Sequence, residues 1–462
     1  MKKTLQSSFL LILSIAAIAI SACNKKAAPL AIPTLEINPV VTDLTSTTIT
    51  IRGRYTTNNI ITENGFCFSS TNHSPTTADI VLTDTIAIHW KSKITALVPG
   101  QTYYFRAYAK NDGGTGYSDV LTVTMPLNDA VPTGTVTTFV GSIFGTGDYI
   151  DGVGTAAALD GPQNIAFNPV NNLLYVSDTY NNAIRTIDLN ASTSTLNISE
   201  VGYADGLLSQ ARFYGPRGIS FDTQGNAYVA DLGNNLIRKI STTGTVSTVA
   251  GNTIPGYVDG DATKAEFFNP TATTTDGTGN VYVADRTNNL IRKITPGGVV
   301  SAFSGYLALA GYSQTSVPGY LNGGTGVAEY NYPVAVTTGV DGNIYVADNK
   351  NQAIRMITPA GDVSTYVGGL YYPDMITSPT SVVLDAQGNM FIVDSDGRIL
   401  EVTNKHVLYV LAGASKTVGF KNGVGAIARF SNPQSIAVDK QGNLYVADYN
   451  NNVIRKITIA VQ

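Results

Sequence analysis

The sequence predicts an all-β protein. A strand–turn–strand motif occurs six times in the last two thirds of the chain, and the repeats show no helical periodicity. The 462 residues include 45 glycines and 25 tyrosines, and 43% of all residues are hydrophobic, which suits a turn-rich β protein with an ample core. This length suggests roughly two to four domains.

The repeated motif is represented by GNVYVADRTNNLIRKI, from Gly279 to Ile294. Its alternating apolar run leads into a polar turn, and the apolar pattern then resumes, which predicts two strands joined by a tight turn. The asparagine pair tolerates the left-handed backbone that such a turn requires. A strand that opens with proline precedes each copy, and a fourth strand follows, as in GTVSTVAG from Gly244. Four short antiparallel strands per repeat are typical of a propeller blade.

An aspartate ends the second strand of every copy, and successive aspartates are 53, 54, 63, 46 and 54 residues apart. In five copies an arginine follows seven residues later. We expect these carboxylates and guanidinium groups to pair and to hold the ring together. The predicted structural pairs are Asp178 with Arg185, Asp231 with Arg238, Asp285 with Arg292, Asp348 with Arg355, and Asp448 with Arg455.

The two ends of the repeat array predict how the ring closes. The last copy stops without its fourth strand, while an isolated strand, GTVTTFVG from Gly134 to Gly141, precedes the first copy. We expect this strand to complete the sixth blade, because an unclosed ring would leave two exposed sheet edges.

The motif YVAD..NN.IRKI resembles NHL repeats, and residues 134–462 resemble a six-bladed NHL β-propeller. Residues 33–126 contain short alternating strands such as ENGFCFS, in which Cys67 is expected to be an apolar core residue. The run LVPGQTY from Leu97 resembles the tyrosine-corner region of fibronectin type III domains, and its companion pieces are similar to modules of Bacteroidetes surface lipoproteins. This resemblance implies an immunoglobulin-like sandwich that acts as a spacer, with residues 127–133 as the linker to the ring.

The N-terminal segment predicts export. Residues 1–22 carry two lysines, an apolar run and a small-residue end, as signal peptides do. The sequence ISAC resembles a bacterial lipobox, which implies cleavage before Cys23 and acylation of Cys23, palmitate included. Residues 23–32 then form a tether. Asn24 in place of aspartate favours anchoring in the outer membrane, facing either the periplasm or the cell surface.

Composition excludes several functions. A net charge of −4 with 13% charged residues provides no polycation for nucleic acid. Of three histidines, only His406 lies in the predicted ring, and a single histidine cannot form a metal cluster or an acid/base pair. The sequence therefore predicts no catalytic residue, no metal and no cofactor.

The loops between blades carry a second repeated feature, GYxDG and its variants, expected on the same rim as the asparagine turns. These loops could stack on sugar rings or could fasten neighbouring blades, and recurrence at nearly every junction favours fastening. Their aromatic residues are Tyr149, Tyr203, Tyr257, Tyr320 and Phe420, and their polar residues are Asp151, Asp205, Asp259, Asn322 and Asn422.

The repetition fails around blades three to five, where one connection is longer and another lacks the GYxDG loop. A ligand without sixfold symmetry should bind where the repeat is broken, although loop length also drifts freely. The candidate ligand-binding residues in this region are Tyr306, Tyr312, Tyr371, Tyr372, Asp374, Asp394, Asp396 and Arg398.

These observations predict an exported, lipid-anchored binding protein. The resemblance to lipoproteins of glycan-foraging bacteria implies a glycan ligand and an outer-membrane transporter as partner. Two alternatives stay open: a lyase or lactonase-type hydrolase that uses acidic residues at the propeller channel, and a protein-interaction platform.

Overall fold

The computed structural model describes residues 30–56, 60–142, 149–306 and 318–461. The predicted signal peptide and Cys23 lie outside these residues, as does most of the tether. The chain forms two compact units. The first consists of residues up to Ile37, Arg52–Ser92 and Thr102–Thr124, and the second of Asn38–Ile51, Lys93–Gln101 and Met125–Gln462. The second unit thus takes in two segments of the range predicted as sandwich.

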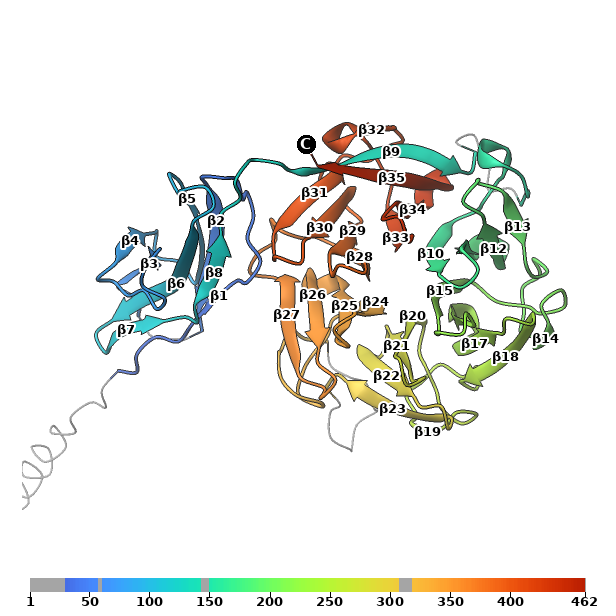
Figure 1. Ribbon diagram of the computed structural model, residues 1–462. Helices are drawn as coiled ribbons and strands as arrows, with labels where there is room; N and C mark the ends of the chain where they lie inside the picture. Colours follow the sequence, from blue (N-terminus) through green and yellow to red (C-terminus); the bar gives the residue numbers. More distant parts are fainter. Residues whose placement is uncertain (1–29, 57–59, 143–148, 307–317, 462) are drawn as a thin grey trace, which may run out of the picture. The chain divides into compact units, whose positions relative to one another are not determined.

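The first unit is built around two antiparallel sheets (Figure 1). Its apolar centre includes Phe66 and Trp90, whose ring centroids lie 5.8 Å apart, and Cys67 is buried. One sheet has the order β1 (Leu35–Ile37), β2 (Ile49–Tyr55), β5 (His89–Ile94). The other has the order β4 (Ile80–Thr83), β3 (Glu63–Ser69), β6 (Thr102–Asn111), β7 (Gly114–Tyr117), with β8 (Leu121–Thr124) also on β6.

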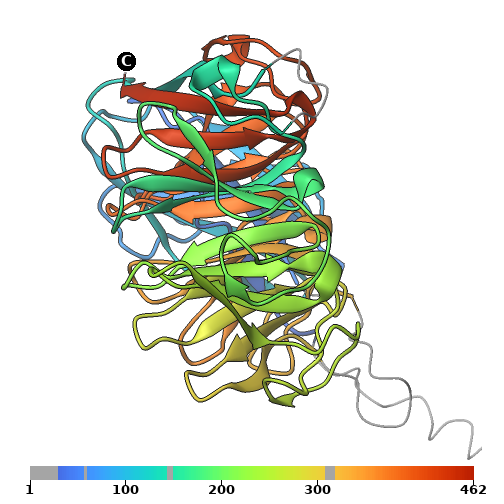
Figure 2. The same cartoon turned by 90° about the vertical axis from the view of Figure 1, so that its right-hand side faces the viewer.

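In the second unit, six antiparallel sheets surround a central axis (Figure 1), and Figure 2 shows them from the side. We number these blades along the chain. Blade one has β10 (Pro162–Asn168), β11 (Leu173–Asp178), β12 (Ala183–Ile187) and β13 (Thr193–Thr195); blade two has β15 (Pro216–Phe221), β16 (Ala227–Asp231), β17 (Leu236–Ile240) and β18 (Thr245–Ala250); blade three has β20 (Pro270–Thr275), β21 (Val281–Asp285), β22 (Leu290–Ile294) and β23 (Val299–Ser304).

The remaining blades follow the same order. Blade four has β24 (Pro333–Thr338), β25 (Ile344–Asp348), β26 (Ala353–Ile357) and β27 (Val363–Gly368); blade five has β28 (Pro379–Leu384), β29 (Met390–Asp394), β30 (Arg398–Val402) and β31 (Leu408–Gly413); blade six has β33 (Pro433–Val438), β34 (Leu444–Asp448), β35 (Val453–Val461) and β9 (Pro132–Val140). Short outer strands β14 (Gly206–Leu207), β19 (Gly260–Asp261) and β32 (Gly423–Val424) extend three of these sheets.

The fold is all-β, as the sequence predicts: the described residues contain strands and 3₁₀ turns but no α-helix. None of their helical segments is long and apolar enough to cross a membrane. Apolar clusters fill the space between neighbouring blades; one joins Tyr228 and Ile237 of blade two to Val283 and Ile294 of blade three.

The asparagines of the motif end the turns between second and third strands. In four blades this turn is a 3₁₀ segment, η2 (Thr179–Asn181), η3 (Leu232–Asn234), η4 (Asn349–Asn351) or η6 (Tyr449–Asn451), rather than a two-residue hairpin loop. The next residue is left-handed, with φ of 55° at Asn235. Asparagine tolerates this conformation, which explains its place in the motif. Two further 3₁₀ segments, η1 (Gly154–Ala156) and η5 (Gly425–Ile427), lie in loops between blades.

The two ends of the propeller sequence meet in blade six. Strand β9 pairs antiparallel with β35, and Val136 lies opposite Ile457. Both side chains are buried in the same apolar cluster. The Asn452 side chain also accepts a 2.9 Å hydrogen bond from the backbone N–H of Gly161, which links blade six to blade one.

Candidate functional site

Each repeated arginine lies at the centre of a buried clamp. Arg238 in blade two donates to Asp231 at 2.9 Å and to Asp205 at 2.5 Å. Its guanidinium lies over the ring of Tyr203 and over the ring of Phe213, with 5.0 Å to either centroid. Asp205 and Tyr203 belong to the loop that enters blade two, so the clamp fastens that loop to the blade.

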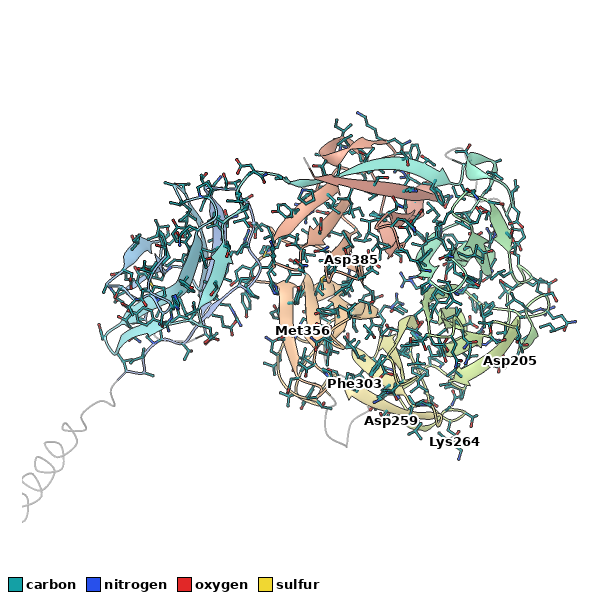
Figure 3. All side chains as sticks on the ribbon, in the orientation of Figure 1. Asp205, Asp259, Lys264, Phe303, Met356 and Asp385 are labelled. Atoms are coloured by element: carbon teal, nitrogen blue, oxygen red, sulfur yellow. The ribbon has the colours of Figure 1, made fainter. Side chains whose placement is uncertain are left out.

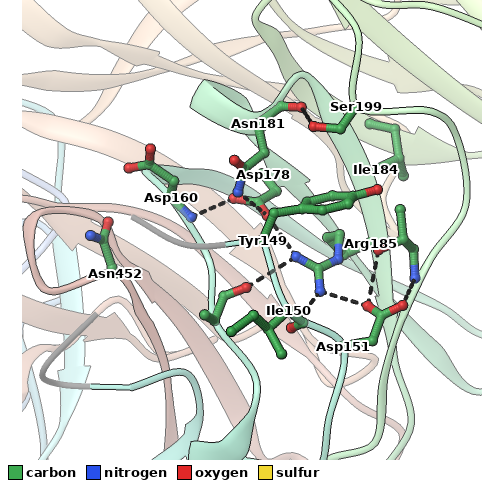
Figure 4. A network of polar contacts seen from close by, with 12 residues as sticks. Tyr149, Ile150, Asp151, Asp160, Asp178, Asn181, Ile184, Arg185, Ser199 and Asn452 are labelled. Atoms are coloured by element: carbon green, nitrogen blue, oxygen red, sulfur yellow. Dashed lines mark hydrogen bonds and ion pairs between the residues drawn. The ribbon is translucent and has the colours of Figure 1, made fainter. Parts of the chain in front are cut away.

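The same clamp recurs in blades one, three, four and six, and Figure 4 shows it around Arg185. The strand pairs are Asp178–Arg185 at 2.8 Å, Asp285–Arg292 at 2.9 Å, Asp348–Arg355 at 2.9 Å and Asp448–Arg455 at 2.8 Å. The loop partners are Asp151, Asp259, Asn322 and Asn422, and the loop rings are Tyr149, Tyr257, Tyr320 and Phe420. Asp205 and Asp259 lie near the outer strands of their blades (Figure 3).

The strand carboxylates of the clamps are fully buried and engaged within the fold. Asp231 also accepts hydrogen bonds from the Asn234 side chain and the Tyr214 backbone N–H, both at 2.8 Å. Burial raises the pKa of Asp231, Asp285 and Asp348 to about 6, while these hydrogen bonds and the guanidinium act in the opposite direction. These residues therefore hold loops and blades together.

The predicted acidic turn of blade five is also engaged in the fold. Asp394 is fully buried, pairs with Arg398 at 2.5 Å and accepts the backbone N–H groups of Thr377 and Ser378. Asp396 accepts hydrogen bonds from the Ser415 hydroxyl at 2.5 Å and from the Lys416 backbone N–H at 2.9 Å. Because Asp394 is inaccessible, we assign this turn to the anchoring of the two loops beside it.

The other predicted ligand residues lie in separate surroundings. Tyr371 contacts Tyr320, with ring centroids 5.9 Å apart, so it extends the outer face of the blade-four clamp. Tyr372 packs against the apolar cluster that contains Ile376. Asp374 is exposed and Tyr306 is half-buried. Tyr312 lies outside the described residues.

The first strands of all six blades enclose a channel along the axis. A cavity of about 410 Å³ is lined by strands β10, β15, β20, β24, β28 and β33, together with residues just beyond some of them. A narrower cavity of about 40 Å³ lies where the same strands begin. Both cavities are lined by Asn164, Gly218, Ala272, Ala335 and Ser381, so they follow one another along the channel.

Around the narrow cavity, the six blades differ in the side chain that they carry at one equivalent position. One residue from each blade, the one after the proline that opens its first strand, lines this cavity. These residues are Gln163, Arg217, Thr271, Val334, Thr380 and Gln434. Arg217 is the only charged residue of the six. Its Nη2 donates a 3.3 Å hydrogen bond to Gln434.

Residues from the adjoining turns surround Arg217. Burial and the charge of Arg286 lower the pKa of Arg217 to about 10, while Tyr332, Tyr449 and Tyr180 act in the opposite direction. Tyr180 and Tyr449 hydrogen-bond to each other through their hydroxyl groups. The channel mouth is defined hereafter by Gln163, Tyr180, Arg217, Arg286, Tyr332, Lys350, Gln434 and Tyr449.

Tyr332 is the strained residue of the mouth. Its φ is 64°, a left-handed value that is a genuine outlier for a bulky residue. Other blades have smaller residues at this position before the proline, among them Gly161, Gly215, Asn269 and Asn432. The Tyr332 ring stacks with two cations, Arg286 at 4.8 Å and Lys350 at 4.5 Å from its centroid. Backbone strain of this kind collects at functional sites.

The channel mouth was not predicted from the sequence. The prediction looked for a ligand site where the lengths of the loops change, whereas the residues of the mouth differ from blade to blade at single aligned positions of the repeat. Alignment of the six copies shows one such column after the proline and another after the aspartate, where Arg286 and Tyr449 stand. That signal was available in the sequence.

The sequence resembles one family model and several curated proteins. The family model described as "NHL repeat" matches residues 430–457, which span most of blade six. The chain is 29% identical over 330 residues to SUPPRESSOR OF QUENCHING 1 of Arabidopsis thaliana, covering 64% of this chain and 30% of that protein. It is 25% identical over 283 residues to Teneurin-m of Drosophila melanogaster, covering 55% of this chain and 10% of that protein. The chain thus spans less than a third of these relatives.

Solved structures share the whole architecture. A protein of unknown function from Bacteroides thetaiotaomicron matches with a TM-score of 0.53 and 17% identity, over 94% of this chain and 99% of that one. The ring is a β-propeller, and its sixth blade matches the NHL-repeat model. An auxiliary nutrient binding protein from Bacteroides ovatus matches this propeller chain with a TM-score of 0.52 and 14% identity, over the same shares of the two chains. At these identities the likeness shows the fold.

Proposed function

We propose that this chain is an exported binding protein whose NHL propeller binds a glycan at the channel mouth. The observation that carries the proposal is Tyr332, a strained aromatic residue stacked with Arg286 and Lys350 where the sixfold repeat is broken. Strain is retained where it serves function, and a sugar ring can stack on the tyrosine by displacing the exposed Lys350 side chain.

The fold neighbours support a binding role. The Bacteroides ovatus structure is described as an auxiliary nutrient binding protein, and its likeness extends over 94% of this chain. Recognition of a nutrient outside the cell agrees with the export signal in residues 1–22 and with acylation at Cys23. We therefore propose an outer-membrane location, with an outer-membrane transporter as the partner.

We extend the proposal to the first unit, to the closure of the ring and to the rim. The two sheets of the first unit support a fibronectin type III-like spacer. The pairing of β9 with β35 supports a six-bladed ring closed by its own two ends. Tyr306, Tyr371, Tyr372 and Asp374 remain a predicted second contact on the rim. The enzyme alternative finds no support in Asp394, because that carboxylate is buried and engaged in the fold.

Binding to a panel of immobilised polysaccharides tests this function. The wild-type protein should be retained by at least one glycan, and Tyr332→Gly should weaken that retention roughly tenfold or more through loss of the stacking ring. Glycine accepts the positive φ, so the variant should stay folded. The matched control is Tyr214→Gly, which removes an exposed tyrosine outside the mouth. Retention by no glycan, or equal retention of both variants, would contradict the proposal.

A further inference from the structure

The channel mouth carries positive charge that the protein does not neutralise. The ion pairs formed by the described residues join clamp and surface arginines to carboxylates, and none of them includes Arg217 or Arg286. The repeated arginines differ, because each pairs with a buried carboxylate, as Arg238 does with Asp231. The two guanidinium groups of the mouth thus differ from those of the clamps in having no carboxylate partner among the described residues.

Both arginines are placed at an energetic cost. Burial lowers the pKa of Arg217 and of Arg286, so their charged forms are disfavoured in the folded protein. The Nε of Arg286 is buried and has no hydrogen-bond partner among the described residues, but this also holds for clamp arginines such as Arg185 and Arg292, so it does not by itself mark a ligand site. What sets Arg217 and Arg286 apart is that neither has a carboxylate partner among the described residues, and a partly buried cation without a counter-charge favours the binding of an anion.

The neighbouring side chains add donors and aromatic faces. Gln434 accepts from Arg217 through its Oε1, and its Nε2 donates to Asn432. Gln163 lines the same narrow cavity. Lys350 is exposed and reaches the mouth over the ring of Tyr332. A ligand bound at the mouth therefore contacts both cationic side chains and aromatic rings.

We propose that the glycan bound at the mouth is acidic, with a uronic acid carboxylate held by Arg217 and Arg286. This inference rests on the proposed function. The planar guanidinium fork matches a carboxylate through two parallel hydrogen bonds, and such charge-assisted pairs are the strong ones. The carboxylate supplies the counter-charge for both arginines.

Isothermal titration of the purified protein with two trisaccharides tests the inference: galacturonic acid trisaccharide and the neutral galactose trisaccharide. The acidic probe should bind at least tenfold more tightly, and its affinity should fall as sodium chloride is raised. Arg217→Gln and Arg286→Gln should each lose roughly tenfold or more in affinity. The charge-matched control is Arg212→Gln in an outer loop, an exposed arginine paired with Glu200, which should bind as wild type does.

Thermal unfolding separates a lost site from a lost fold. Arg217→Gln should melt at or near the wild-type temperature, because Arg217 is only partly buried and forms no ion pair among the described residues. Equal affinity for the two trisaccharides, unchanged by Arg217→Gln, overturns the acidic ligand but leaves glycan binding intact. Failure to bind either trisaccharide overturns the inference, and the polysaccharide panel then decides on the proposed function separately.

Discussion

At the scale of single residues, the protein uses arginine in two ways. Arg238 and its equivalents are buried with paired carboxylates and stacked aromatic rings, so they stabilise the ring. Arg217 and Arg286 lie without carboxylate partners among the described residues and mark the channel mouth. Residue type alone therefore does not distinguish scaffold from site; the partners do.

The clamp predicts a large loss of stability on substitution of its arginine. Arg238→Met should lower the free energy of unfolding by about 3–5 kcal/mol, because it leaves Asp231 buried without its counter-charge. Chemical denaturation measures this change. The control Arg212→Met breaks the exposed 2.6 Å pair with Glu200 and should cost no more than about 1 kcal/mol. Similar losses for the two variants would refute the clamp as the main tie between loop and blade.

Glu401 predicts a pH dependence of stability. Burial, and secondarily the charge of Asp385, raise the pKa of Glu401 to about 7, and its Oε2 is buried without a hydrogen-bond partner among the described residues. A carboxyl whose pKa is raised in the folded state binds protons more readily folded than unfolded. Its contribution to stability is therefore present below the unfolded pKa of 4.5 and is lost as pH rises to about 7.

Glu401→Gln should remove this dependence. At pH 8 the variant should be more stable than wild type by about 1–3 kcal/mol, and at pH 4 the two should be equal. Thermal melting across this pH range provides the measurement. A wild type whose melting temperature rises from pH 4.5 to 7 more steeply than that of the variant would show the opposite sign for Glu401.

At the scale of elements, the blade is the structural unit, and the turn between its second and third strands links it to the next blade. The left-handed asparagine that follows the 3₁₀ turn accepts a backbone N–H from the next blade: Asn182 from Gly215, and Asn235 from Asn269. Blade four has Gln352 at this position, and its Oε1 is buried with no partner among the described residues. The neighbouring loop, Gly369 to Ser378, is where the repeat pattern is lost.

The pairing of β9 with β35 makes a prediction at this scale. Val136→Asp should place an unpaired charge in the cluster with Phe430 and Ile457, and so detach β9. Amide hydrogen exchange of residues 454–460 should then accelerate markedly, whereas the exposed control Thr137→Asp should leave it nearly unchanged. Unchanged protection in Val136→Asp would mean that β35 does not depend on β9.

The strands and turns were predicted well from the sequence, because the same pattern occurs six times. The aspartate, the asparagine turn and the proline-led strand all follow from local rules of turns and alternation. For the channel mouth, the sequence shows the two variable columns but not that they meet: Arg217 and Arg286 are 69 positions apart and come together only when the blades close around an axis. Nor could it show that Asp394 is buried, since an acidic turn has the same letters whether it faces solvent or binds adjacent loops.

At the scale of the whole molecule, the ring separates stability from recognition. The repeated clamps lie in the loops and outer parts of the blades, while the non-repeating residues gather on the axis, where all six blades contribute one side chain each. A ligand on the axis contacts several blades at once without sixfold symmetry. We propose that this arrangement serves glycan recognition at the channel mouth.

A crystal structure of the protein with the glycan selected from the polysaccharide panel tests that claim most directly. We expect ligand density at the channel mouth, with a sugar ring on Tyr332 and an acidic group beside Arg217 and Arg286. Density confined to the outer rim, around Tyr371 and Asp374, would contradict it.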